Sequence, residues 1–297
     1  MRKPFGAVLA ALFLLLTACG ERPHATGAAT EPVYNNMIPQ PPVQEVQPVR
    51  PAAPEPFRPM PEIPLEPEAE ILPAEPPYDF GAPLAATEPV EDSHFADAVF
   101  IGDSRTEGLQ LFSGLKQGTF LWLRDAVLYR GELPKYALFG DGEEKVTMLE
   151  ALGQKTYGAV YIFTGLNELE RSPEYFREKL TGFVDRVLEL QPRAAVYLQT
   201  VLPIHDASAR KSGLGAHFSN AGVDAFNEVI RQVAEEKRVL LLDTAEVYRG
   251  EDGQLPGEMT SDGCHFKAKY YKLWAEYLRS HVVAPEDYLN DRGQEIA

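Results

Sequence analysis

Three short segments far apart in the chain hold the residue types that a serine hydrolase uses. The first contains Ser104, the second contains Asn167, and the third contains both Asp262 and His265. A serine hydroxyl is a weak nucleophile at neutral pH, so it needs an imidazole to accept its proton and a carboxylate to orient that imidazole. The oxyanion that forms needs hydrogen-bond donors, which an amide side chain supplies. Together the four residues predict nucleophilic attack on an acyl group.

The elements that must position these residues follow from the hydrophobic pattern. Short apolar runs typical of buried strands alternate with segments of helical period, in which apolar residues recur every three to four positions. The runs predict strands at 98–101, 119–123, 159–163, 195–201 and 239–242. The helical segments are 106–114, 145–152, 173–190, 220–236 and 268–281, and Asn220 is expected to cap the fourth of them.

Strands that alternate with helices predict a flavodoxin-like, three-layer α/β/α fold with a five-stranded parallel sheet. Right-handed crossovers favour the strand order 2-1-3-4-5, with a switch point between the first and third strands. Ser104 follows the first strand and Asn167 follows the third, while Asp262 and His265 lie in the long loop after the fifth. Carboxyl ends of parallel strands share one edge of the sheet, so the four residues are expected to converge there.

The three segments together resemble the GDSL/SGNH hydrolase superfamily, specifically its bacterial lipoprotein-type esterases. The first block reads Gly-Asp-Ser-Arg at 102–105, the third reads Gly-Leu-Asn at 165–167, and the fifth reads Asp-Gly-Cys-His at 262–265. The resemblance covers roughly residues 97–283. The first block differs from the G-x-S-x-G elbow of the α/β-hydrolases.

Carried over residue by residue, the resemblance implies a role for each residue of the set. Ser104 would be the nucleophile, and His265 would act as general base and then as general acid toward the leaving alcohol. Asp262 would orient the imidazole. The Asn167 amide and the Ser104 backbone N–H would donate to the oxyanion.

The second block departs from the family pattern. Relatives have a glycine after the second strand whose N–H is a further oxyanion donor, whereas this chain reads Asp125 there. Either the backbone N–H of Asp125 still contributes, or the oxyanion hole has two donors instead of three.

Several other residues have two interpretations each. Arg105 is a substrate contact or a helix-start residue, and His205 lines the pocket or belongs to a solvated loop. Cys264 is a reactive thiol or a small residue that fills the loop. We expect no cofactor and no metal, because the histidines lack the H-x-x-x-H or paired-cysteine spacing of zinc sites.

Residues 1–19 resemble a bacterial lipoprotein signal. Arg2 and Lys3 precede an apolar segment too short to span a bilayer comfortably, and small residues precede Cys19. We therefore expect an extracytoplasmic protein anchored to the membrane by a lipid on Cys19; the alternative is an ordinary secretory signal. Cys264 is the second of only two cysteines, so the mature protein is expected to contain no intramolecular disulfide.

Net charge is unevenly distributed along the chain. The formal net charge is -16, and residues 20–95 hold 13 acidic and three basic residues together with 18 of the 25 prolines. Such a composition predicts a disordered tether. The expected hydrolase domain is 96–285, followed by a tail at 286–297. This domain is mildly acidic, which argues against a nucleic-acid partner; we expect a monomer.

The leading hypothesis is a serine esterase that removes short acyl groups, such as O-acetyl, from a cell-wall or extracellular glycan. Three alternatives remain open at this stage. They are an O-acyltransferase on the same fold, a lysophospholipase-like lipase, and a surface binding module without catalytic activity.

Overall fold

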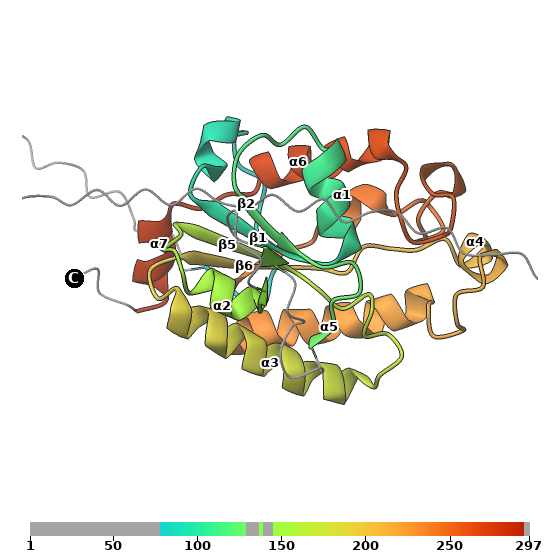
Figure 1. Ribbon diagram of the computed structural model, residues 1–297, viewed down its shortest axis with the longest axis horizontal. Helices are drawn as coiled ribbons and strands as arrows, with labels where there is room; N and C mark the ends of the chain where they lie inside the picture. The colour runs from blue at the N-terminus through green and yellow to red at the C-terminus, as the bar shows by residue number, and fades with distance from the viewer. Residues whose placement is uncertain (1–77, 129–136, 139–144, 294–297) are drawn as a thin grey trace, which may run out of the picture. The chain divides into compact units, whose positions relative to one another are not determined.

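The five apolar runs form one parallel sheet in the computed structural model, which describes residues 78–128, 137–138 and 145–293 (Figure 1). In spatial order the strands are β2 (Thr119–Trp122), β1 (Ala98–Gly102), β5 (Ala159–Phe163), β6 (Ala195–Gln199) and β7 (Leu240–Leu242). The predicted order 2-1-3-4-5 and the three-layer α/β/α architecture are therefore confirmed. The switch point lies between β1 and β5, which pair with each other. From β1 the chain continues to β2 on one side of this pair, and from β5 it continues to β6 on the other side.

Helices cover both faces of the sheet (Figure 1). One face carries α2 (Met148–Leu152), α3 (Pro173–Leu190) and α5 (Asn220–Lys237), and the opposite face carries α1 (Ser104–Phe112), α6 (Tyr271–Arg279) and α7 (Pro285–Asp291). The short α4 (Asp206–Lys211) follows β6. Short 3-10 turns lie at η1 (Asp92–Phe95), η3 (Glu246–Tyr248), η4 (Gly257–Met259) and η5 (Ala268–Tyr270).

The alternation of side chains along each strand divides the core into two clusters. Val160 and Ile162 of β5 face the cluster under α3 and α5, whereas Tyr161 and Phe163 face the cluster under α1 and α6. The second cluster contains an aromatic ladder across four paired strands, made of Phe120, Phe100, Tyr161 and Tyr197. Their rings stack with centroid distances of 4.4–4.8 Å. Such stacking adds to the free energy gained from burial of the rings.

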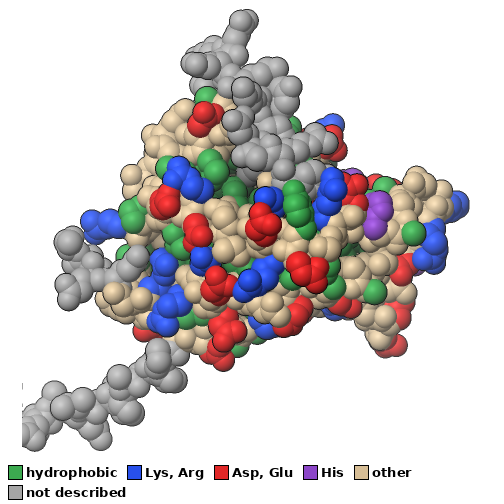
Figure 2. Space-filling model, turned by 90° about the horizontal axis from the view of Figure 1, so that it is seen from below, with side chains coloured by type: hydrophobic (Ala, Val, Ile, Leu, Met, Phe, Trp, Pro, Cys, Tyr) green, Lys and Arg blue, Asp and Glu red, His purple; other side chains and the backbone are tan. Residues whose placement is uncertain are grey.

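The two longest helices cover the other face and pack against each other through Phe176 and Phe226. These rings stack at 4.3 Å between centroids. Figure 2 views the molecule from this side, and its surface carries interspersed acidic and basic side chains. Ion pairs such as Arg177–Glu236 and Lys237–Asp185 link α5 to α3 across that surface. Exposed pairs of this kind contribute little to stability, so the apolar contact holds the helices in place.

The predicted helix at 145–152 is wrong over its first turn. Lys145–Val146 forms a short strand, β4, which pairs antiparallel with β3 (Ala137–Leu138). The helix begins only after Thr147, whose side chain accepts from the Glu150 N–H while the Glu150 carboxylate accepts from the Thr147 N–H. This capping box fixes the start of the helix, and the β-branched Val146 suits the extended conformation that precedes it.

Two further helix boundaries differ from the predictions in detail. Ser219, rather than Asn220, is the N-cap of α5, and it accepts from the Gly222 N–H. The Asn220 side chain instead donates to the Ile204 carbonyl and to the Asp206 carboxylate. The predicted helix at 268–281 begins as the 3-10 turn η5 before continuing as α6.

The packed structure extends beyond the expected domain limits of 96 and 285. On the N-terminal side, the Leu84 N–H donates to the Leu241 carbonyl at the edge of the sheet, and the Val90 N–H donates to the Arg279 carbonyl. On the C-terminal side, the Tyr288 ring of α7 is fully buried and contacts Phe80 edge to face. Both expected limits are too narrow because the polar stretches on either side of the domain contain apolar residues, and burial of these residues against the domain is favourable.

The expected signal peptide, Cys19 and most of the expected tether lie outside the described residues. So does residue 294 onward of the expected tail. Within the described part of the chain, no helix has the length and apolar content needed to cross a bilayer.

Candidate active site

Ser104 is the first residue of α1, directly after the end of β1. The Asp103 side chain caps this helix by accepting from the Arg105 N–H at 2.8 Å. The cap starts α1 two residues before the predicted position. Backbone N–H groups in the first turn of a helix have no acceptor within the helix and carry partial positive charge. The Ser104 hydroxyl and N–H are therefore placed together at the carboxyl edge of the sheet.

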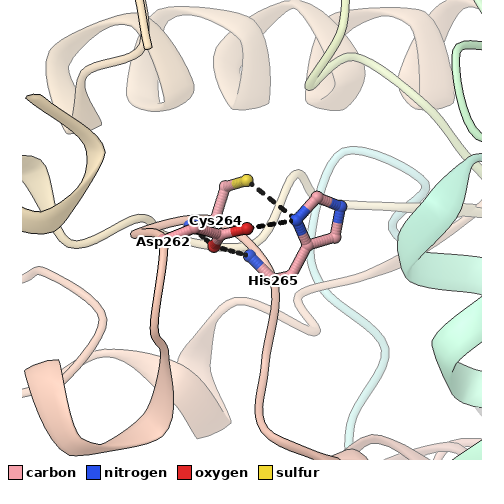
Figure 3. A group of neighbouring side chains, drawn as sticks. All are labelled: Asp262, Cys264 and His265. Atoms are coloured by element: carbon pink, nitrogen blue, oxygen red, sulfur yellow. Dashed lines mark hydrogen bonds and ion pairs between the residues drawn. The ribbon is translucent and has the colours of Figure 1, made fainter. Parts of the chain in front are cut away.

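The loop after β7 brings Asp262 and His265 to Ser104, and His265 lies 161 residues further along the chain. The Ser104 Oγ lies 2.8 Å from the His265 Nε2, and the His265 Nδ1 lies 2.7 Å from the Asp262 Oδ2. Figure 3 shows the imidazole with its Nδ1 side turned toward the carboxylate. The second carboxylate oxygen, Oδ1, accepts from the backbone N–H groups of Cys264 and His265. Hydroxyl, imidazole and carboxylate thus form one continuous hydrogen-bonded chain.

The ionisation of this pair follows from its hydrogen bonds. Hydrogen bonding to the Asp262 side chain and then to the Cys264 thiol raises the pKa of His265, although partial burial opposes this. Burial acts to raise the pKa of Asp262, but hydrogen bonds from His265 and from backbone N–H groups lower it overall. Asp262 is therefore ionised at neutral pH, and it increases the basicity of the imidazole.

Gly263 allows the loop to adopt the turn that this geometry needs. Its φ is +97°, in the left-handed region, and a Cβ at this position would lie 2.3 Å from the backbone N of Ala209. Thr260 fixes the same turn, because its hydroxyl donates to the His265 carbonyl and accepts from the Gly263 N–H. Only glycine combines this φ with this closeness to α4.

Arg105 does not contact the pocket, so its interpretation as a substrate contact is wrong. Its side chain is 0% exposed. The guanidinium donates to the carbonyls of Cys264 and Leu202 at 2.8 Å each, and it lies 5.2 Å from the centre of the Phe266 ring. Arg105 therefore ties the start of α1 to the loop after β6 and to the loop that carries His265. A planar group with five donors suits this role.

Asn167 lies at the same edge, but its amide group is used within the protein. Its Nδ2 donates to the carbonyl of Arg124 at 3.3 Å and to that of Ala126 at 3.1 Å. These are the two neighbours of the exposed Asp125. In this state Asn167 holds the second-block loop, and the oxyanion-hole prediction for Asn167, Asp125 and the Ser104 N–H stays a prediction.

Glu168, which follows Asn167, is buried and braces the third-block loop. Its carboxylate accepts from the backbone N–H groups of Leu128 and Gly165 and from the Thr164 hydroxyl. Burial raises the pKa of Glu168 to about 7. These contacts agree with a structural role.

His205 is an N-cap, not a residue of the cavity beside Ser104. Its Nδ1 accepts from the Ser208 N–H at the start of α4. The residues that line the cavity do not include it. A histidine at a strand end can also cap the following helix, so neither interpretation from the sequence, a pocket residue or a solvated loop residue, describes His205.

Cys264 is buried in the loop that also carries Asp262 and His265. Its side chain is 4% exposed, and its Sγ lies 3.3 Å from the His265 Nδ1. It therefore fills the loop, as one of the two interpretations expected, but it also touches the imidazole. Cys19, the expected lipidation site, lies outside the described residues.

A cavity of about 380 Å³ opens beside Ser104 and His265. Its walls include five residues that the sequence had not indicated: Glu107, Leu111, Phe112, Arg124 and Tyr271. The first three share α1 with Ser104, and residues three to four positions apart lie on one face of a helix. Glu107 is three positions after Ser104, and this spacing is the sequence feature that could have indicated its place beside the cavity.

Arg124 closes one side of the cavity by a bidentate ion pair. Its Nε and Nη2 donate to the two oxygens of Glu107 at 2.7 Å each, which lowers the pKa of Glu107. The pair joins the second-block loop to α1. Leu111 and Phe112, which also line the cavity, are 59% and 47% exposed, so part of its wall is apolar and open to solvent.

The family model described as the GDSL-like lipase/acylhydrolase family matches residues 100–273. No curated protein matches the chain. A solved structure from Streptococcus pneumonia, assigned provisionally as a platelet activating factor, aligns with 20% identity and a TM-score of 0.49, over 61% of this chain and 81% of that chain. A GDSL-like lipase from Bacteroides thetaiotaomicron aligns with 16% identity and a TM-score of 0.45, over 64% and 88% of the two chains. The acetyl xylan esterase AlAXEase aligns with 14% identity and a TM-score of 0.45, over 63% and 99%.

Proposed function

Because this chain belongs to the GDSL-like lipase/acylhydrolase family and is an ester-hydrolysing enzyme, we propose that it removes short acyl groups, such as O-acetyl, from a cell-wall or extracellular glycan. The observation that carries the proposal is the contact of 2.8 Å between Ser104 Oγ and His265 Nε2 beside an open cavity. A hydroxyl that donates to an imidazole held by a carboxylate is arranged for nucleophilic attack.

In the proposed first step, Ser104 attacks the ester carbonyl. The Oγ–carbon bond forms while the hydroxyl proton passes to the His265 Nε2, and Asp262 stabilises the imidazolium through Nδ1–H. The imidazolium then gives its proton to the alcohol oxygen as the ester bond breaks. This leaves an acyl group on Ser104 and a neutral imidazole.

In the second step, water replaces the alcohol. The neutral His265 accepts a proton from the water, whose oxygen forms a bond to the acyl carbon. The proton then returns to Ser104 Oγ as the acyl–enzyme bond breaks, and the carboxylic acid leaves. The enzyme returns to its starting protonation state, so no cofactor takes part in the proposed cycle.

We assign oxyanion binding to the Ser104 N–H and to the Asn167 amide. The Ser104 N–H lies at the positive end of α1. Of the two Asn167 contacts, the bond of 3.3 Å to the Arg124 carbonyl is the weaker and is the one that would yield to an oxyanion. The remaining bond to Ala126 would keep the amide in place.

The glycan part of the proposal depends on the placement of the enzyme. Residues 1–19 resemble a lipoprotein signal, and the acidic, proline-rich stretch that follows is suited to hold the domain away from a membrane. An enzyme tethered in this way would act on polymers outside the cytoplasm. A direct check is metabolic labelling with a radioactive fatty acid, which should mark the wild-type chain and not the Cys19→Ser variant.

A p-nitrophenyl ester series tests the activity. The purified chain should hydrolyse the acetyl ester, and Ser104→Ala should reduce the turnover number by about 10⁴-fold or more. Turnover of the wild type that is no faster than that of Ser104→Ala would contradict the esterase proposal. With an acetylated glycan and an added acceptor sugar, appearance of acylated acceptor would favour acyl transfer over hydrolysis.

A second candidate, a lipase that acts on longer acyl chains, is favoured by one observation. Leu111 and Phe112 form an exposed apolar wall next to Ser104. Each methylene buried there contributes about 0.8 kcal/mol. In the same ester series, kcat/KM that rises steadily from acetyl to octanoyl would favour the lipase, whereas a maximum at acetyl or propionyl would favour the deacylase.

A further inference from the structure

The loop that carries Asp262 and His265 also brings a third metal-ligating group to them. A carboxylate oxygen of Asp262, the Cys264 Sγ and the His265 Nδ1 all lie within 4.8 Å of one another (Figure 3). The thiol has no part in the proposed mechanism. Within residues 78–128, 137–138 and 145–293, no other group of three such side chains is brought together.

We propose that these three side chains bind a divalent cation of the Zn²⁺ class, and that the bound cation switches the enzyme off. Thiolate, imidazole and carboxylate are the ligands that zinc takes in proteins. Three protein ligands leave a fourth position for water. The spacing of the ligands along the chain differs from the H-x-x-x-H and paired-cysteine motifs of zinc sites, because all three come from one four-residue turn.

Two of the three distances between ligand atoms need only small changes to accommodate the ion, and the third, between the Cys264 Sγ and the Asp262 carboxylate, is at most 4.8 Å and must close by up to about 1 Å. Zinc lies about 2.3 Å from sulfur and about 2.0–2.2 Å from nitrogen and oxygen, so tetrahedral ligands are separated by roughly 3.4–3.6 Å. The Sγ–Nδ1 distance is already 3.3 Å. The Nδ1–Oδ2 distance of 2.7 Å must grow by well under 1 Å, which a rotation of either side chain provides.

The site is also partly preformed and reachable. The backbone N–H groups of Cys264 and His265 hold the Asp262 Oδ1, and Thr260 holds the turn. Although Cys264 is buried, the side chains of Asp262 and His265 are 42% and 45% exposed. An ion can therefore enter from the side of the carboxylate and meet the thiol last.

The proposed inhibition follows from the two nitrogens of the imidazole. Metal at Nδ1 displaces the proton there, and the neutral ring then carries its proton on Nε2. An Nε2–H group donates a hydrogen bond and cannot accept the Ser104 proton. Binding also converts the Cys264 thiol to a thiolate, so one proton leaves as the complex forms, because the neutral ring keeps its own proton and carries it on Nε2 instead of Nδ1. The cavity beside Ser104 stays open, and the base is lost by a change of tautomer.

The inhibition rests on the proposed role of His265, whereas metal binding itself does not. Two measurements separate them, both on the full chain with Cys19→Ser so that Cys264 is the only thiol. The first is the Zn²⁺ concentration that halves ester hydrolysis. Each variant is compared with its own metal-free rate, which removes differences in basal activity.

Loss of Cys264 should weaken inhibition strongly. A change to a group that only supports a ligand costs 10–100-fold in metal affinity, so Cys264→Ser should raise the half-inhibitory concentration by at least about 10-fold. Asp287→Asn removes an exposed carboxylate on α7 and should change nothing. Equal inhibition of the Cys264→Ser variant and its parent would overturn the proposal.

The second measurement does not require activity. Titration of Ser104→Ala with Cd²⁺ should produce the ultraviolet charge-transfer absorption of a cadmium–thiolate bond, and Cys264→Ser should abolish it. ¹⁵N NMR of the histidine rings with Zn²⁺ should show the His265 proton on Nε2. Absence of the cadmium band would refute the site even if the esterase proposal holds. A band without inhibition would refute the tautomer mechanism.

Discussion

The interior of the sheet and its carboxyl edge are built from opposite kinds of residue. Every residue of β1, β5 and β7 is buried, and apart from the Tyr161 hydroxyl their side chains are apolar or are those of glycine. Just beyond β1, Asp103 and Arg105 are buried although both carry ionisable groups, and Glu168 is buried beyond β5. Burial of such groups costs several kcal/mol unless hydrogen bonds and opposite charges compensate.

The difference indicates which property each region controls. Apolar burial in the strands and under the helices supplies the free energy that makes the buried charged groups at the edge tolerable. At the edge, hydrogen bonds place Ser104, His265 and Asp262 in contact. We therefore expect substitutions at the edge to change rates and pH profiles, and substitutions in the interior to change the free energy of unfolding.

Among the substitutions that test the difference between the edge and the interior, Asp262→Asn should have the largest effect. Loss of the carboxylate should reduce kcat by about 10⁴-fold, since the imidazole loses both its orientation and the charge that stabilises it. Asp262 raises the pKa of His265, and the active base is lost as the pH falls through that pKa. The acidic limb of kcat should therefore move to lower pH in the variant. A limb at the wild-type position would show that another group is the base.

Asn167→Ala should reduce kcat by about 10²–10³-fold with little change in KM, because an oxyanion donor acts only in the transition state. Steady-state kinetics on the ester series measure this. Asn290→Ala, an exposed amide on α7, is the matched control and should be neutral. A tenfold rise in KM with unchanged kcat would assign Asn167 to the second-block loop alone.

Phe226→Ala should show the reverse pattern. Loss of its stacking on Phe176 under the sheet should cost about 3–5 kcal/mol in the free energy of unfolding, while kcat of the folded protein stays near the wild-type value. Urea denaturation and kinetics at low temperature measure the two quantities. Phe112→Ala removes an exposed cavity wall, so it should raise KM and leave stability nearly unchanged. If Phe226→Ala lowers kcat at a temperature where the variant is folded, the expectation that interior residues control stability and not rate is wrong.

Glu168→Gln should produce the smallest effect, one on the pH dependence of stability. Burial raises the pKa of Glu168 from 4.5 to about 7, so the folded state holds its proton more tightly than the unfolded state does. Stability from this group is then fully present below about pH 4.5 and is lost as the pH rises toward 7. The wild type should lose stability relative to the Gln variant between pH 5 and pH 8. Parallel curves from chemical denaturation would contradict a raised pKa.

The same contrast explains what the sequence predicted and what it did not. The strands and the long helices were predicted well, since their periodicity is local and residues such as Val160 and Phe183 face the core. The convergence of the three segments followed from the strand order. The burial of Arg105 did not, because its acceptors at Leu202 and Cys264 are brought near only by tertiary folding. The packing of Phe80 and Tyr288 was likewise hidden within polar segments.

Glu107 and Arg124 belong to the same class of missed residues. Neither is unusual in its own segment, and the bidentate pair exists because α1 and the loop after β2 meet. From the sequence, the Cys264 thiol has two interpretations, a nucleophile or a residue that fills the loop, whereas its contact with the imidazole nitrogen depends on the left-handed turn at Gly263. Local patterns predict elements well, and contacts between loops depend on their exact paths.

Labelling with a fluorophosphonate probe, followed by mass mapping of the modified peptide, tests the central claim most directly. We predict a covalent adduct on Ser104, absent in Ser104→Ala and formed more slowly by orders of magnitude in His265→Ala. An adduct that forms at the wild-type rate without the imidazole, or no adduct on Ser104 at all, would contradict it.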